Sequence, residues 1–141
     1  MLSVPKYGWT DFSIGGNEYS LSYLTDVPID WLESAVYGLT NQRPFVVYAE
    51  CEPEEIHLTV TEMFCHVIYE GHEPNPETYF VKMTMLDFCK ALYADISRDV
   101  DAWADWSRYD DENFREEQKR KIQSLLDELD ALIKEQSKYE T

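Results

Sequence analysis

Six side chains of this sequence are of the types that ligate zinc or act as a nucleophile with its base: His57, His66, His72, Cys51, Cys65 and Cys89. Neither a C-x-x-C nor an H-x-x-x-H spacing occurs among them, so no two are placed in advance as metal ligands. Cys65 and His66 are adjacent, so on a strand they would point to opposite faces and could not act as a pair. We therefore predict no metal site, no cofactor and no catalytic residue, and we interpret Cys65 and Cys89 as buried apolar side chains.

Carboxylates are abundant and form two clusters along the chain. The sequence holds 28 acidic and 12 basic residues, which gives a net charge of −16. The first cluster surrounds Cys51 and consists of Glu50, Glu52, Glu54 and Glu55. The second follows a helical pattern and continues beyond it, and consists of Asp95, Asp99, Asp101, Asp105, Asp110 and Asp111. Each cluster creates a strong local anionic field, and we predict that both contact a partner.

Two aromatic residues lie within the second cluster. Trp106 falls off the apolar stripe of the predicted helix, and Tyr109 lies in the loop that follows it. Tryptophan and tyrosine are enriched in the hot spots of protein interfaces, so both are candidate partner contacts. Trp103 fits the apolar stripe and is predicted to lie in the core.

The charge balance restricts the class of partner. Residues 1–81 contain two basic side chains, Lys6 and Arg43, and 13 acidic ones. Nucleic-acid and anionic-membrane surfaces are bound by basic patches, so we expect no direct contact with either. An anionic surface speeds association with a cationic protein, so a basic protein is the expected partner. The alternative is that the acidic surface serves only solubility.

The first half of the chain shows mainly strand patterns. Residues 11–24 alternate apolar and polar side chains about Gly15-Gly16-Asn17, which predicts a hairpin. A short amphipathic helix begins near Pro28 and stops at 38–41. Residues 45–48 form an apolar run typical of a central strand, residues 56–69 predict two strands or one bent strand, and residues 79–83 predict another.

The second half is helical. Thr84 and Asp87 form a capping arrangement, and apolar residues then repeat at helical spacing, which predicts one helix over 85–106. A last helix of about 25 residues carries a heptad-like seam. The predicted fold is α+β: an antiparallel sheet of five or six strands, with a short and a long helix packed on it and a long C-terminal helix. We assign residues 1–112 to an α+β domain and 113–141 to an amphipathic helix packed on that domain.

Targeting signals are not visible. The first nine residues contain no apolar run of a secretory signal, and no stretch approaches the roughly 18 apolar residues that span a bilayer. Three cysteines are an odd number, which favours reduced thiols over a disulfide framework. We expect a cytoplasmic protein.

Three segments resemble the small acidic immunity proteins of bacterial toxin systems. They are the opening pattern Asp11-Phe12-Ser13-Ile14-Gly15 with Tyr19-Ser20-Leu21-Ser22-Tyr23-Leu24, the helix after Pro28, and the helix ending Ala102-Trp103-Ala104-Asp105-Trp106. The resemblance covers the first 106 residues and does not predict the C-terminal helix. It implies a cytoplasmic protein that neutralises a cognate basic toxin, commonly a nuclease, by plugging its positively charged cleft.

The leading hypothesis is a non-enzymatic binding protein, monomeric or homodimeric, whose acidic and aromatic face inhibits a basic protein. A second hypothesis is a DNA mimic that occupies the nucleic-acid channel of a defence nuclease. A third is a structural protein that oligomerises through the seam of the last helix, formed by Ile122, Leu125, Leu129 and Leu132. An enzyme is the last alternative, because acidic pairs arise by chance in so acidic a chain.

Overall fold

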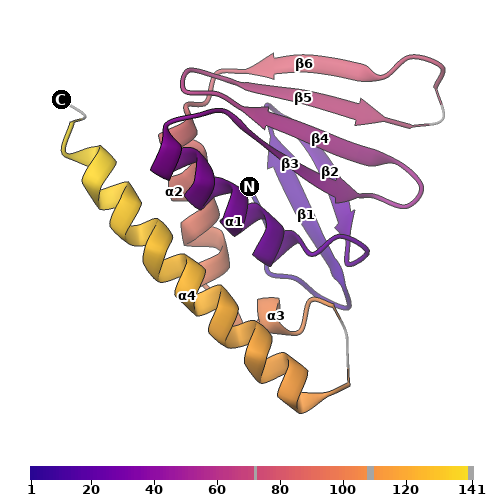
Figure 1. The fold of residues 1–141 in the computed structure, drawn as a ribbon. Coiled ribbons are helices and arrows are strands. Elements are labelled where there is room, and N and C mark those ends of the chain that lie inside the picture. The colour runs from indigo at the N-terminus through magenta and orange to yellow at the C-terminus, as the bar shows by residue number, and fades with distance from the viewer. Residues whose placement is uncertain (72, 108–109, 140–141) are drawn as a thin grey trace.

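The computed structural model describes residues 1–71, 73–107 and 110–139, which form six strands and four helices (Figure 1). The elements in chain order are β1 (Trp9–Ile14), β2 (Asn17–Ser22), α1 (Val27–Asn41), β3 (Phe45–Glu50), β4 (Glu55–Val60), β5 (Cys65–Glu70), β6 (Glu77–Val81), α2 (Met85–Ser97), α3 (Val100–Ala104) and α4 (Glu112–Ser137). The fold is α+β, as predicted.

The strands form two antiparallel sheets, so the prediction of one sheet with five or six strands is wrong. Among the strands, β1 pairs with β2 in a separate two-stranded sheet, and the order β3-β4-β5-β6 makes a four-stranded meander. The hairpin packs on a face of the larger sheet instead of extending its edge, because Phe12, Ile14 and Leu21 need burial. Its turn residue Gly15 lies against the side chain of Val81 on β6.

The β1–β2 hairpin has the two-residue turn that its glycines predict. Ile14 pairs with Asn17, and Gly15 and Gly16 between them have φ angles of +58° and +82°. Positive φ at both central residues gives a turn whose twist matches that of the strands. Facing the larger sheet, the Tyr19 hydroxyl bonds that of Tyr79.

Strand β3 is an edge strand, whereas its apolar run predicted a central one. Its side chains alternate, so that Val47 is buried and Val46 is 52% exposed. At its free edge, the Trp31 indole N–H donates to the Tyr48 carbonyl at 2.9 Å, and the Glu50 N–H donates to the Thr25 hydroxyl at 2.9 Å. Two side chains therefore make hydrogen bonds with backbone groups of β3 that an added strand would otherwise use.

The remaining strands follow a simple meander. The segment 56–69 forms two strands, β4 and β5, joined by a turn in which the Thr61 hydroxyl donates to the Phe64 carbonyl at 2.7 Å. Strand β6 begins at Glu77 and ends at Val81, two residues earlier than predicted at each end.

The helix predicted over 85–106 is interrupted. Helix α2 ends at Ser97, and Asp99 then leaves the helical conformation with φ −151°. Its carboxylate accepts the Ala102 N–H at 3.0 Å and so caps a new short helix, α3. A capping aspartate competes with the continuing backbone, which is the physical reason for the break.

Helix α4 packs along α1, α2 and α3 (Figure 1). Ile122, Leu126 and Leu129 are fully buried, while Leu125 and Leu132 are partly buried against the same core. The heptad-like seam thus packs within the chain, fully at three of these positions and partly at the other two.

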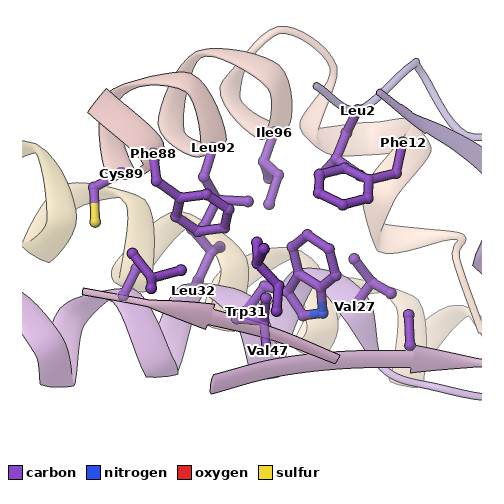
Figure 2. Close-up of a cluster of buried hydrophobic side chains, with 14 of the residues drawn as sticks. Leu2, Phe12, Val27, Trp31, Leu32, Val47, Phe88, Cys89, Leu92 and Ile96 are labelled. Carbon is purple, nitrogen blue, oxygen red and sulfur yellow. The ribbon is translucent and has the colours of Figure 1, made fainter. Parts of the chain in front are cut away.

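The core lies between the helices and the inner face of the four-stranded sheet (Figure 2). At its centre Trp31 meets the ring of Phe12 edge-on, with centroids 5.2 Å apart, and also contacts Phe88. Cys65 and Cys89 have no exposed surface, which confirms their interpretation as buried apolar side chains.

Candidate binding surface

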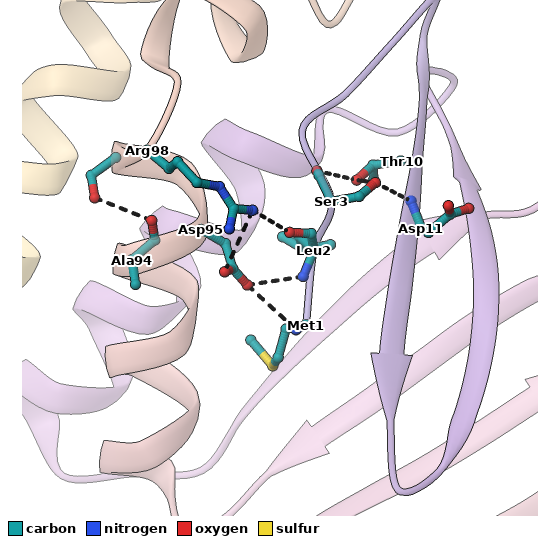
Figure 3. Close-up of polar contacts among 9 residues, drawn as sticks. Met1, Leu2, Ser3, Thr10, Asp11, Ala94, Asp95 and Arg98 are labelled. Carbon is teal, nitrogen blue, oxygen red and sulfur yellow. Dashed lines mark hydrogen bonds and ion pairs between the residues drawn. The ribbon is translucent and has the colours of Figure 1, made fainter.

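The aspartates of the second acidic cluster have largely local partners. Asp95, on α2, accepts the backbone N–H of Leu2 at 2.9 Å and lies 3.6 Å from the amino group of Met1 (Figure 3). Arg98 completes the contact by donating to the Leu2 carbonyl at 3.0 Å. The side chain of Asp95 is only 15% exposed, so it holds the N-terminal segment against α2.

Three more of these aspartates serve the helices. Asp99 caps α3, and Asp111 caps α4 by accepting the backbone N–H of Asn113 at 2.9 Å. Asp101 lies 2.8 Å from the ammonium group of Lys119 on α4, and this hydrogen bond and charge lower the pKa of Asp101. The spacing of these aspartates is therefore explained by helix capping and by the contact between α3 and α4. It does not place them on one shared external face.

Trp106 does not lie on the surface, so its expected exposure is wrong. It is 2% exposed, and its indole N–H donates to the buried carbonyl of Thr25 at 2.7 Å. The break at Asp99 resets the helical phase and turns Trp106 inward, beside Trp103, which is buried as predicted. The other aromatic candidate, Tyr109, lies outside the described residues.

Asp105 and Asp110 line a hollow of about 380 Å³ between α3 and the N-terminal loop. Lys6 and Tyr7 line the same hollow, and the Lys6 ammonium lies 5.6 Å from the centroid of the Tyr7 ring. This hollow therefore already contains a cationic side chain of the protein.

The first acidic cluster is also divided by the structure. Glu52 is exposed in the turn between β3 and β4. Burial, and after it the charge of Glu54, raises the pKa of Cys51 and of Tyr69. Glu50 and Glu55 lie at paired positions of β3 and β4, on the outer face of the sheet.

The structure adds a third carboxylate that the sequence did not identify. Glu70 on β5 pairs directly with Glu55, so Glu50, Glu55 and Glu70 follow one another across three strands. We call these three residues the glutamate row. Strand register brings Glu70 into the row, and a single strand's pattern does not reveal which residue of another strand stands opposite.

Tyr48 and His57 border the glutamate row. The Tyr48 hydroxyl bonds the carboxylates of Glu50 and Glu55, the latter at 3.1 Å, and Glu50 foremost raises the pKa of Tyr48. The His57 Nε2 lies 3.3 Å from Glu55 Oε1, and the hydrogen bonds from His57 and Tyr48 lower the pKa of Glu55. Glu55 is therefore ionised at neutral pH.

The opposite end of the outer face is apolar. Val46, Phe64 and Phe80 are 52%, 39% and 69% exposed. The ring of Phe80 stacks on His66, with centroids 4.5 Å apart, and meets Phe64 at 5.3 Å. This exposed apolar end could have been predicted from the alternating pattern of the strands, because its side chains alternate with the buried ones.

The outer face thus runs from carboxylates through Tyr48 and His57 to exposed phenylalanines. Its side chains are half-buried or exposed, while the helices and the hairpin pack on the inner face (Figure 1). The outer face therefore combines an anionic end with an exposed apolar end.

Donor atoms of Glu55, His57 and Glu70 lie within 4.8 Å of one another, a mixed set that could hold a divalent cation. The cysteines lack such a setting. They are buried and unpaired, and burial raises the pKa to about 11 for Cys51 and Cys65 and to about 12 for Cys89. Neutral thiols are poor nucleophiles and poor metal ligands.

None of the described helices combines the length and the apolar character needed to cross a bilayer. Comparison with family models, with curated proteins and with solved structures finds no match for the chain.

Proposed function

We propose that this chain is a non-enzymatic acidic protein that binds and neutralises a basic partner protein through the outer face of its four-stranded sheet. The glutamate row carries the proposal. Like charges directly opposite on neighbouring strands are destabilising, yet Glu50, Glu55 and Glu70 occupy consecutive paired positions. A cationic partner would relieve this repulsion on binding.

The chain itself supplies little positive charge to the row. Within the part of the chain that the structure describes, the ion pair made by the row is the one between Glu55 and His57. Other acidic residues meet lysines, as Asp101 meets Lys119 and Asp130 meets Lys134. Among the described residues, the row thus makes its ion pair with a histidine rather than with a lysine or an arginine, which a cationic partner could supply.

The biological class that we propose is an immunity protein that blocks a bacterial toxin, such as a nuclease. The large acidic excess and the resemblance of the first 106 residues to such proteins support this class. Proteins that bind nucleic acid present basic clefts, and an acidic surface can fill such a cleft.

Capture from a native lysate at about 50 mM salt, followed by elution towards 1 M, tests the proposal, because screening shortens to about 3 Å at 1 M. The wild-type chain is compared with the triple variant Glu50→Gln, Glu55→Gln, Glu70→Gln. We expect one basic protein in the wild-type eluate, with its activity inhibited by the chain, and a strong loss of capture by the variant.

A matched control is the triple variant Glu116→Gln, Asp127→Asn, Glu128→Gln, which removes the same charge from exposed positions of α4. If both triple variants lose capture equally, binding depends on total charge, and the outer face is rejected as the binding surface. An eluate without a basic protein would reject the function.

A further inference from the structure

Resting on the proposed function, we infer that the outer face selects arginine over lysine in its basic partner. The guanidinium group lies against the glutamate row beside Tyr48 and His57, and an apolar side chain of the same partner rests on the Phe64 and Phe80 end. The occupant is thus a segment that carries an arginine and an apolar residue at a fixed separation.

The spacing of the carboxylates favours a forked cation. Glu50, Glu55 and Glu70 lie on adjacent strands, and adjacent strands are about 4.8 Å apart. A guanidinium group presents five N–H donors in a planar fork and can bond two carboxylates at once. An ammonium group is a compact point charge and gains less from two separated acceptors.

Tyr48 orients two of the three carboxylates before any partner arrives. Its hydroxyl bonds both Glu50 and Glu55, and its ring lies 4.9 Å from that of His57. Carboxylates that are already oriented lose less conformational entropy on binding. The two rings also offer faces on which a weakly hydrated guanidinium stacks better than a strongly hydrated ammonium.

The apolar end defines the second contact. Val46 stands four residues before Glu50 on β3 and shares its face, which corresponds to about 13 Å along the strand. Phe80 belongs to the same cross-strand line as Val46, through Thr59 and His66. An arginine and an apolar side chain four residues apart in an extended segment match this distance.

Two synthetic peptides of equal length and charge provide the probe: the amidated and acetylated sequences RTRTFTF and KTKTFTF. Each is titrated into the isotopically labelled full chain, and amide chemical shifts give both the affinity and the contact surface. We expect the arginine peptide to bind about tenfold more tightly, equivalent to one extra charge-assisted contact. The shifts should gather on β3, β4 and β5.

Substitutions separate the two ends of the surface. Glu55→Gln with Glu70→Gln should remove the preference for arginine, and Phe80→Ser should weaken both peptides alike. The α4 triple variant, with unchanged outer-face residues, should bind like the wild type. Equal affinity of the two peptides for the wild-type chain, or shifts centred on the hollow of Asp105 and Asp110, would overturn the inference.

Two further results distinguish this inference from the proposed function. A captured basic protein that needs the glutamate row, together with equal peptide affinities, would reject arginine selection and retain the function. Arginine selection without any captured protein would reject the function alone. Concentration-dependent dimers that Phe80→Ser dissolves would make a second copy the occupant and overturn the inference.

Discussion

Single acidic residues in this protein serve opposite purposes according to their surroundings. Asp95, Asp99 and Asp111 accept backbone N–H groups and fix local structure, whereas the glutamate row faces outward. Asp26, before α1, belongs to neither group. Its Oδ1 is buried without a hydrogen-bond partner among the described atoms, and burial raises the pKa of Asp26 by more than the contacts of the carboxyl group with Ile29, Gln118 and Lys121 lower it.

Asp26→Asn should therefore stabilise the protein at pH 7, by an amount on the order of 1 kcal/mol in the free energy of unfolding. A carboxyl group with a raised pKa in the folded state penalises folding while it is ionised. The gain should shrink as the pH falls through the raised pKa and vanish below the ordinary value of 3.8.

Urea unfolding at pH 7 and at successively lower pH measures this effect, with Glu33→Gln on the exposed side of α1 as the control. A variant that is less stable than the wild type at pH 7 would show that the charge of Asp26 supports the fold.

The burial or the role of a single side chain could be predicted only where the local sequence determined it. The apolar character of a free cysteine identified Cys65 as buried, and helical spacing placed Trp103 in the core. Trp106 was misplaced because its phase depends on the break that Asp99 introduces. Glu70 was missed because its role arises from pairing with another strand.

At the scale of elements, local signals predicted the individual pieces and tertiary packing decided their assembly. Glycine spacing predicted the hairpin, and apolar periodicity predicted α1 and α4. The hairpin pairs with no strand of the larger sheet, because its turn meets the face of β6. No pattern within the hairpin distinguishes packing on a face from pairing at an edge.

The hairpin turn offers a matched pair of substitutions. Gly15→Ala and Gly16→Ala both place a side chain at positive φ, which is unfavourable for alanine. A Cβ on Gly15 would lie 2.8 Å from Val81 Cγ2, whereas one on Gly16 meets open space. Because valine is stiff at χ1, Gly15→Ala should destabilise the protein by about 1 kcal/mol more than Gly16→Ala.

Thermal unfolding of both variants, and of Gly15→Ala combined with Val81→Ala, measures this difference. Val81→Ala removes the clash, so the combined variant should be less destabilised than the sum of the two single substitutions. Equal melting temperatures for the two glycine variants would mean that the hairpin does not rest firmly on β6.

For the whole molecule, the dominant property is uneven charge. The net charge is −16, and residues 1–81 contain 13 acidic side chains against two basic ones. Helix α4 is closer to balance and contributes lysines to ion pairs with Asp101, Asp130 and Glu117. The remaining excess repels itself in the folded state.

Added salt should therefore stabilise the free protein and weaken the proposed complex with a basic partner. We expect the melting temperature to rise by several degrees between about 20 mM and 0.5 M sodium chloride, because the screening length falls below about 10 Å. Scanning calorimetry measures this rise. The glutamate-row triple variant should show a smaller rise, and a melting temperature that falls with salt would contradict self-repulsion.

The two edges of the larger sheet have different consequences for association. Trp31 and Thr25 occupy the free side of β3, whereas β6 is paired on one side only. Strand addition can therefore proceed past β6 but not past β3. Within the larger sheet of the described residues, β6 is therefore the edge at which a strand of a second copy would add, and pairing of β6 with its own copy would give a closed pair rather than a growing fibre.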